Sequence, residues 1–187
     1  MANRLLLSEL LTEEQCHKRV SDADIAAAAE FSSLSRRREY LTWRAMLYEA
    51  LDRRVSIAYE DGAPIVVGEN IYIGVSHTTD MAAVVISENA CAVVVERADG
   101  DVGGVASRFF TERERQLAAD SASQVAVWCA RECCYKYCRN KQLDILGDIG
   151  VTELDMAGGS VTAEVKDGLV LKMRIEQTAD HIVVYVL

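Results

Sequence analysis

The sequence is short of positive charge, of proline and of long hydrophobic runs. It has 20 lysines and arginines against 29 aspartates and glutamates, which gives a formal net charge of -9. Phosphate neutralisation needs a basic surface, so we predict that the chain binds no nucleic acid. Its longest apolar runs, such as Met81 to Ile86, are far too short to span a bilayer, and a basic segment followed by a long apolar core is absent from the N-terminus. We therefore expect no membrane segment and a cytoplasmic location.

Half of the 187 residues are apolar, which is enough for a sizeable core. That core can belong to one domain or be shared by two small halves. The chain has a single proline, and it contains no low-complexity linker and no internal repeat. The order of the expected helices and strands by itself supports only an α+β fold.

Cysteine is the residue whose placement needs explanation. Four of the six cysteines, Cys129, Cys133, Cys134 and Cys138, fall in one expected helix. On a helix the first two share one side and the last two lie on roughly the opposite side, so the four cannot converge on one tetrahedral zinc ion. We expect buried free thiols instead.

The stretch from Ile71 to Arg97 has the strongest strand pattern. Three β-rich runs, 71–75, 82–86 and 91–95, are separated by polar turns, which predicts a β-meander. Ser76 and His77 follow the first run, and the last run ends at Glu96. Each polar break therefore places functional groups at a strand end.

A second stretch, 125–139, is expected to form a helix that faces the end of this meander. Trp128, Glu132 and Lys136 recur at i, i+4 and i+8, so one side of the helix carries all three. In isolation, Glu132 and Lys136 could be only an exposed pair worth about 0.3 kcal/mol to helix stability. Trp128 alone would most simply be a core residue.

The flanking segments predict further helices and strands. Ser35 is the expected N-cap of a long helix from Arg36 to about Leu51. Residues 161–165, 169–176 and 181–187 alternate as strands, with a hairpin turn at 166–168. Before residue 12 we expect no leading strand, so that the chain begins almost at its first helix.

Together the two central stretches resemble the 4′-phosphopantetheinyl transferase superfamily, in its larger form built from two similar halves. The family's Ser-His pair, its Gly-Ile-Asp-Ile-Glu strand and its Trp-x-x-Lys-Glu-x-x-x-Lys helix correspond here to Ser76-His77, to 92–96 and to 128–136. The resemblance extends weakly from about Leu34 to the last strand. It implies two similar α/β halves packed as a pseudo-dimer. We place them at residues 1–88 and 89–187.

The resemblance also implies an activity. Members transfer 4′-phosphopantetheine from coenzyme A to a serine of an acyl or peptidyl carrier protein, with Mg²⁺ bridging diphosphate oxygens. On this basis Glu132 would be a metal ligand and a possible base, and Glu96 a secondary metal ligand. Alternatively, Glu96 could be only the solvated end of a strand.

Four further residues would contact phosphates by the same resemblance. Lys136 would be a phosphate contact, Ser76 and His77 would form a cradle, and Arg44 would lie near the 3′-phosphate of coenzyme A. His77 by itself would more often be a neutral turn histidine, and arginines on a helix often only solvate it. Because carrier proteins are acidic, docking needs a basic patch, for which residues 36–38 with Arg44 are the densest candidate.

Two positions depart from the family pattern. Val94 stands where the family has an aspartate that serves as the principal magnesium ligand, and valine offers no oxygen to a hard cation. Ala63, in Gly62-Ala63-Pro64, replaces a lysine that often reaches the coenzyme A phosphates. Three hypotheses follow: a transferase, perhaps weakened; a non-catalytic relative that binds coenzyme A or a carrier protein; and a structural protein with a vestigial pocket.

Overall fold

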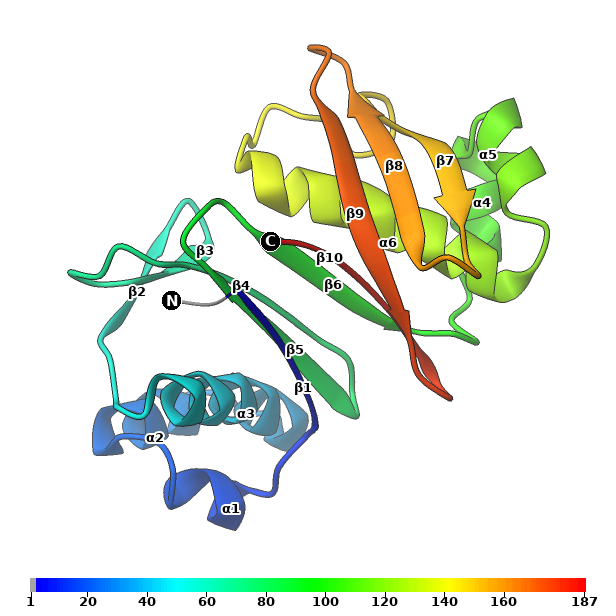
Figure 1. Ribbon diagram of the computed structural model, residues 1–187. Helices are drawn as coiled ribbons and strands as arrows, with labels where there is room; N and C mark the ends of the chain where they lie inside the picture. Colours follow the sequence, from blue (N-terminus) through cyan, green and yellow to red (C-terminus); the bar gives the residue numbers. More distant parts are fainter. Residues whose placement is uncertain (1–2) are drawn as a thin grey trace.

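The computed structural model describes residues 3–187, which form a mixed α+β fold with two antiparallel sheets and a separate hairpin (Figure 1). The three-stranded sheet has the order β1-β5-β4, and the five-stranded sheet has the order β6-β10-β9-β8-β7. The elements up to the end of the first sheet are β1 (Arg4–Glu9), α1 (Glu13–His17), α2 (Asp22–Ala29), α3 (Leu34–Leu51), β2 (Ile57–Glu60), β3 (Ala63–Val66), β4 (Tyr72–His77) and β5 (Met81–Ser87). The remaining elements are β6 (Ala92–Arg97), α4 (Gly103–Phe109), α5 (Glu112–Leu117), α6 (Ser121–Cys138), β7 (Ile149–Asp155), β8 (Ser160–Val165), β9 (Val170–Gln177) and β10 (His181–Val186).

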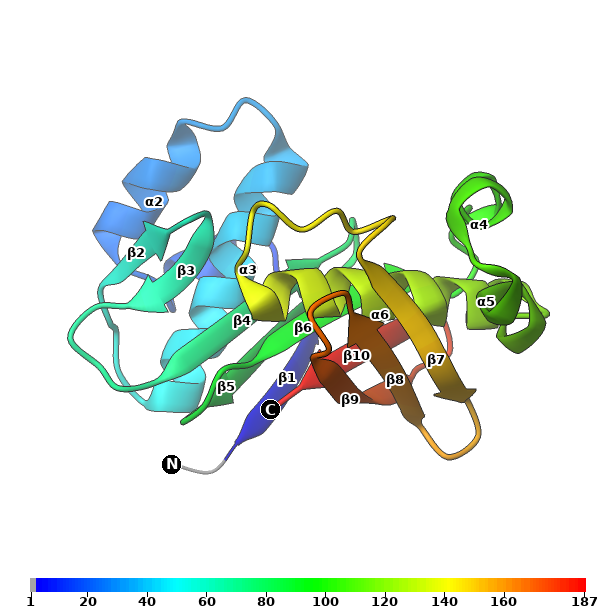
Figure 2. The ribbon, with the colours of Figure 1, turned by 90° about the horizontal axis from the view of Figure 1, so that it is seen from above.

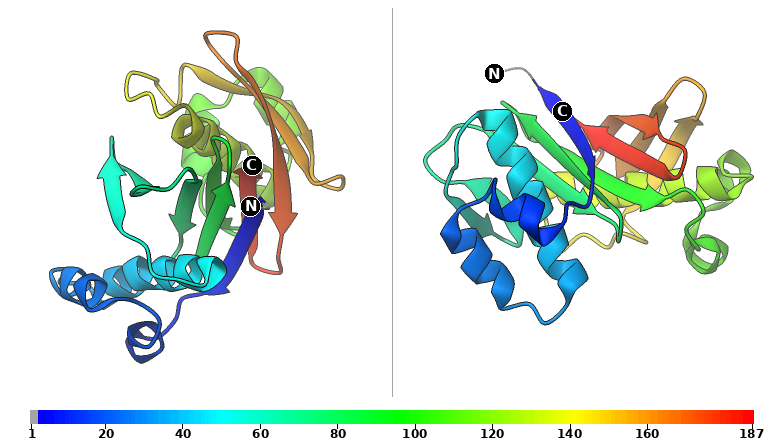
Figure 3. Two further views of the ribbon diagram at one scale, coloured as in Figure 1. Left: turned by 60° about the vertical axis from the view of Figure 1, so that its left-hand side comes forward. Right: turned by 90° about the horizontal axis from the view of Figure 1, so that it is seen from below.

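Each sheet has its own long helix. α3 packs on the three-stranded sheet and α6 lies along the five-stranded sheet, as the view from above shows (Figure 2). The β2–β3 hairpin stands to one side of β4 (Figure 3). Within residues 3–187, no helix is long and apolar enough to cross a membrane.

The predicted meander is wrong in its last step. β4 and β5 form the expected antiparallel hairpin, but β6 pairs with β10 and so begins the second sheet. Both faces of β6 are buried: Val94 packs toward α6, while Val93 and Val95 pack toward the first sheet. A strand buried on both faces reads as a continuous apolar run, and such a run does not reveal its partner strand.

The leading strand expected to be missing is present. Residues 4–9 form β1, which pairs antiparallel with β5 from Arg4 opposite Ile86 to Glu9 opposite Met81. Leu6 packs on the core beneath α3, and Leu5 packs on the cluster between the two sheets. The long helix α3 also begins earlier than predicted, because Ser33 rather than Ser35 accepts the capping hydrogen bond.

Among residues 3–187, apolar side chains gather in three clusters. One lies under α3, one lies under α6, and a third joins the two sheets. The third is composed of Ala83, Val85, Cys91, Val93, Val95, Val183 and Tyr185. The prediction of free thiols is confirmed: Cys129, Cys133 and Cys134 are fully buried in α6 and Cys138 is half-buried.

Candidate functional site

A cleft of about 320 Å³ lies where the two sheets meet, between α3, the β2–β3 hairpin, β4, β6 and α6. All of the site residues predicted from the sequence line it except Arg44. The list is Ser76, His77, Glu96, Glu132 and Lys136. Two strand ends and one helix face, far apart in the chain, therefore converge on one hollow.

Glu96 and Glu132 form the acidic part of the cleft. Strand alternation puts Glu96 on the face of β6 that turns toward α6, where Glu132 lies one turn beyond Trp128. Burial raises the pKa of the Glu132 carboxyl. Burial also raises the pKa of Glu96, and the negative charge of Glu132 raises it further. Two partly desolvated carboxylates that repel each other are an arrangement that a bound cation relieves.

The donor set fits a magnesium ion shared with a substrate. Mg²⁺ is commonly held by one or two carboxylates, with water and substrate phosphate oxygens completing the shell. Glu96 and Glu132 supply such a pair. Within the part of the chain that the structure describes, no three His, Cys, Asp or Glu side chains gather into a metal cage. Val94 is fully buried in the core under α6, and its hydrocarbon side chain has no oxygen to add to the pair.

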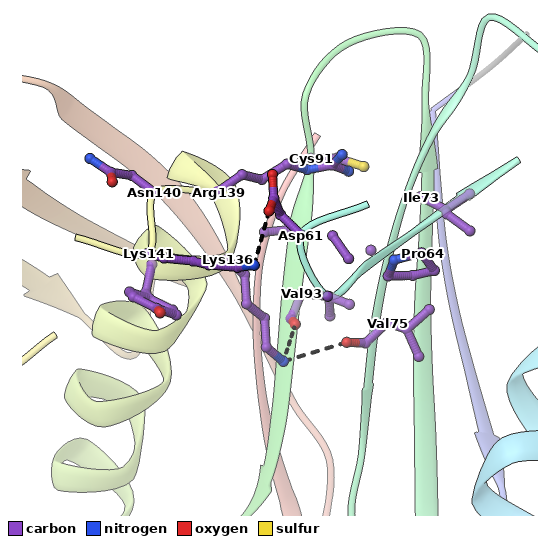
Figure 4. Close-up of a pocket in the computed structure, with 15 residues that line it drawn as sticks. Asp61, Pro64, Ile73, Val75, Cys91, Val93, Lys136, Arg139, Asn140 and Lys141 are labelled. Carbon is purple, nitrogen blue, oxygen red and sulfur yellow. Dashed lines mark hydrogen bonds and ion pairs between the residues drawn. The ribbon is translucent and has the colours of Figure 1, made fainter. Parts of the chain in front are cut away.

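Lys136 joins the two sheets at the floor of the cleft. Its Nζ donates to the carbonyl of Val75 in β4 at 3.4 Å and to the carbonyl of Val93 in β6 at 3.3 Å (Figure 4). Beyond it lies a second cavity of about 220 Å³, with Lys136 on the boundary between the two. An ion pair between Asp61 in the β2–β3 turn and Lys141, 2.9 Å long, is also at this second cavity.

Ser76 also connects β4 to β6. The Val95 backbone N–H donates to Ser76 Oγ at 3.1 Å, so the side chain replaces a backbone acceptor between strands that form no ladder. Close approach of the strands depends on Gly74, where an added Cβ would lie 2.8 Å from Val85 Cγ2 and 3.1 Å from Ala92 Cα.

His77 belongs to a small network with α3. Its Nε2 lies 3.0 Å from Arg36 Nη1, and its Nδ1 lies 3.3 Å from Glu39 Oε2. Because arginine only donates, Nε2 is the acceptor, and the single proton of the neutral ring lies on Nδ1, the nitrogen near Glu39. Burial lowers the pKa of His77 against the opposing effect of Glu39, and Arg36 lowers it further. His77 is therefore a neutral acceptor at this wall of the cleft.

Arg44 lies behind the cleft, so the prediction that it belongs to a basic surface patch is wrong. It is 2% exposed and pairs with Asp24 at 3.1 Å. Arg37 donates to the Phe31 carbonyl, and Arg38 donates to the carbonyls of Leu10 and Leu11. All four arginines of the predicted basic patch thus have partners within the protein, and Arg36, which contacts His77 and Glu39, is the member that lines the cleft.

Sequence reasoning did not assign Arg36, Glu39, Tyr40 or Tyr59 to the site. Arg36, Tyr40 and Trp43 all line the cleft and recur at i, i+4 and i+7 of α3, so one helix face presents them. This helical spacing is the sequence pattern that could have assigned them to the site. No such pattern exists for Tyr59, because the hairpin that carries it reaches the cleft only through its packing on β4.

Comparison with known proteins agrees with this geometry. The family model of the 4′-phosphopantetheinyl transferase superfamily matches residues 92–185, half of the chain, which include Glu96, Glu132 and Lys136. No curated protein matches the chain. A family model that spans β6 to β10 and both carboxylates identifies the chain as a member of the 4′-phosphopantetheinyl transferase superfamily.

Proposed function

We propose that the protein transfers 4′-phosphopantetheine from coenzyme A to a serine of an acyl or peptidyl carrier protein. The observation that carries this proposal is the convergence of Glu96 and Glu132 on a cleft that also presents Lys136, His77 and Arg36. Carboxylates that attract a cation, beside side chains that contact phosphate, are what a diphosphate requires. Membership of the superfamily supplies the reaction class.

The reaction assigns a role to each side chain. The serine oxygen of the carrier forms a bond to the β-phosphorus of coenzyme A, and the bond to the oxygen of adenosine 3′,5′-bisphosphate breaks. Glu132, whose pKa is raised by burial, accepts the serine proton. Lys136 and Arg36 donate to phosphate oxygens, and the neutral His77 accepts a hydrogen bond beside them.

Magnesium held by Glu96 and Glu132 would supply positive charge opposite the diphosphate. The fully buried Val94 leaves this pair without a third carboxylate. Water and substrate oxygens would fill the remaining positions. We therefore expect weaker metal affinity than a site with three carboxylates would have.

Val94 and Ala63 favour one alternative, a non-catalytic relative that binds coenzyme A or a carrier protein. Val94 removes a metal ligand and Ala63 removes a cation, but neither change closes the cleft. Binding without transfer would keep the phosphate contacts of Lys136 and Arg36. The two functions differ only in whether the carrier is modified.

Intact-mass measurement of an apo carrier protein, incubated with the protein, coenzyme A and Mg²⁺, separates them. Transfer adds one phosphopantetheinyl group to the carrier. Glu132→Gln should reduce the rate by about 100-fold or more, since it loses both a ligand and a base. Glu30→Gln, an exposed glutamate at the end of α2, is the matched control and should leave the rate unchanged.

A carrier that stays unmodified while coenzyme A raises the melting temperature would select the binding function. Transfer that persists at the normal rate in Glu132→Gln would refute the assigned roles. Absence of transfer, of coenzyme A binding and of carrier binding would refute both functions.

We further propose that residues 1–88 and 89–187 are the two similar halves of the larger superfamily form. Each range contains one main sheet, one long helix and one apolar cluster of its own, the first range also contains the β2–β3 hairpin, and the cleft lies where the two ranges meet. The chain passes from one sheet to the other between β5 and β6. This arrangement supports the proposed boundary.

A further inference from the structure

Tyr59 is an exposed aromatic residue on the wall of the cleft. It lies in β2 and its side chain is 55% exposed. Single exposed aromatic residues are common and by themselves mean little. The hydroxyl of Tyr59, however, takes part in a polar chain that runs into the protein interior.

That chain fixes the position of the hydroxyl. Arg44 Nη2 donates to Tyr59 Oη at 3.2 Å, and Arg44 Nε donates to Asp24 Oδ1 at 3.1 Å. Asp24 also accepts from the Tyr48 hydroxyl at 3.0 Å, and burial raises the pKa of Tyr48, so that hydroxyl keeps its proton. The guanidinium of Arg44 is itself held over the Tyr40 ring at 3.4 Å and over the Trp43 ring at 4.1 Å.

The result is a ring that faces the cleft while its far end is anchored to a buried ion pair. Tyr40 and Trp43, the other aromatic residues of this wall, each hold the Arg44 guanidinium against a ring. Tyr59 is held through its hydroxyl group and is still 55% exposed, so much of its ring remains accessible to a ligand. A flat surface that is ordered before binding loses little conformational entropy when a ligand stacks on it.

The chemistry along the cleft indicates which flat group this is. The carboxylates come from β6 and α6, the aromatic residues come from α3 and β2, and β4 carries Ser76 and His77 between them. All of these residues line one cleft, so a ligand with its diphosphate at Glu96 and Glu132 can also contact Tyr59. Coenzyme A carries adenosine on one side of its diphosphate and pantetheine on the other, and only the adenosine side ends in a flat ring.

We propose that the ring of Tyr59 is the platform on which the adenine base of coenzyme A stacks, and that Asp24 and Arg44 position it. This inference rests on the proposed function, since it takes coenzyme A as the ligand. It gives Arg44 a positioning role behind the cleft, in place of a direct phosphate contact.

Calorimetry with three ligands tests the proposal. Coenzyme A and adenosine 3′,5′-bisphosphate carry the base, and inorganic pyrophosphate does not. Tyr59→Ala should weaken the binding of coenzyme A and of adenosine 3′,5′-bisphosphate by about tenfold, because both lose stacking on the aromatic ring. It should leave the binding of pyrophosphate, which has no base, unchanged. Tyr59→Phe keeps the ring and should stay within about threefold of the unmodified protein for all three.

Tyr72→Ala is the matched control, since Tyr72 is an exposed strand tyrosine that does not line the cleft. Its affinities should equal those of the unmodified protein, and melting temperatures establish that each variant is folded. If the unmodified protein binds coenzyme A and folded Tyr59→Ala binds it equally well, the stacking role is refuted and the proposed function stands. Equal weakening of all three ligands would also refute it. If the unmodified protein binds no coenzyme A, the proposed function fails and this inference fails with it.

Discussion

Single residues in the cleft hold charges that are unfavourable without a ligand. Glu132 is partly buried, and burial is the main cause of its raised pKa. The pKa of Glu96 is also raised by burial, and the negative charge of Glu132 raises it further. The ligand-free protein is therefore less stable than a chain without these charges, which is a common property of sites that bind cations.

Glu132→Gln should make the ligand-free protein more stable at neutral pH, by about 1 kcal/mol, because it removes a desolvated charge. A carboxyl whose pKa is higher in the folded state takes up a proton first in that state. The stabilisation of the fold that results from this tighter proton binding is fully present below the ordinary pKa near 4.5, and it is lost as pH rises through the raised pKa. The stability difference between variant and parent should therefore grow as pH rises through this window. Thermal melts from pH 4 to 8 measure it, and a pH-independent difference would contradict the burial argument.

Val94→Asp tests the missing ligand. Val94 is fully buried on the face of β6 that also carries Glu96, so an aspartate there should cost about 2–4 kcal/mol in the absence of metal. Magnesium should recover part of this loss and bind more tightly than in the parent, because the new carboxylate joins Glu96 and Glu132.

Val184→Asp is the matched control for Val94→Asp. Val184 pairs with Val94 across β10 and β6 and is equally buried in the same cluster. The Val184→Asp variant should be less stable than the parent, and magnesium should not restore its stability. Melting with EDTA or Mg²⁺, together with calorimetry of metal binding, gives the comparison. A similar response of both variants to magnesium would show that position 94 does not adjoin the proposed metal site.

At the scale of the elements, the cleft depends on how closely β4 approaches β6. The two strands share no backbone ladder, so side chains make the connection through Ser76 and Lys136. α6, which carries Glu132, is fixed in turn by the buried pair of Arg131 and Glu114, whose closest atoms are 2.6 Å apart. Arg131 also donates to the carbonyls of the loop after α6.

Gly74→Ala should separate β4 from β6. The added Cβ would lie 3.1 Å from Ala92 Cα and 3.3 Å from Val93 N, which are backbone atoms that cannot turn aside. We expect a loss of about 1–3 kcal/mol and weaker coenzyme A binding. Gly150→Ala in β7 has open space around its Cβ and should change neither quantity. Denaturant unfolding and calorimetry check both variants, and equal stability of the two would show that the strands do not pack as closely as described.

At the scale of the whole molecule, the two sheets form one unit. They share the buried apolar cluster around Val85, Val93 and Val183. Asp80, in the turn between β4 and β5, lies 2.9 Å from His181 Nε2 and 3.1 Å from Arg97 Nη1. Both partners belong to the second sheet, so this contact also joins the sheets.

Asp80→Asn should weaken this connection by no more than about 1 kcal/mol, because the Asp80 side chain is 45% exposed and solvent screens the pair. Hydrogen bonds from Thr78 and His181 lower the pKa of Asp80 to about 2. A lowered pKa stabilises the fold above the ordinary value near 3.8, and this contribution is lost as pH falls through about 2. The difference between variant and parent should therefore shrink on acidification, as followed by circular dichroism. Asp167→Asn, in the exposed turn between β8 and β9, is the matched control for the loss of a surface carboxylate.

The sequence predicted those features that depend on local spacing. Glu132 and Lys136 were placed on one helix face, and the last three strands were predicted with their hairpin turn, because periodicity reports them directly. The sequence did not reveal that β6 pairs with β10 and not with β5, because the choice of partner strand depends on residues nearly 90 positions later. β7 was missed because Gly150 and the irregular register between Val151 and Glu153 interrupt its pattern. Arg44 looked like a surface cation because its partner Asp24 lies in a different helix.

Lys136 connects the cleft to the junction between the two sheets. In the ligand-free protein its single ammonium group is shared between Val75 and Val93, one carbonyl from each sheet. A phosphate oxygen that binds this nitrogen competes with both carbonyls for the same protons. Under the proposed function, phosphate binding and the contact between the two sheets would therefore depend on the same cation, and a substitution of Lys136 would alter both together.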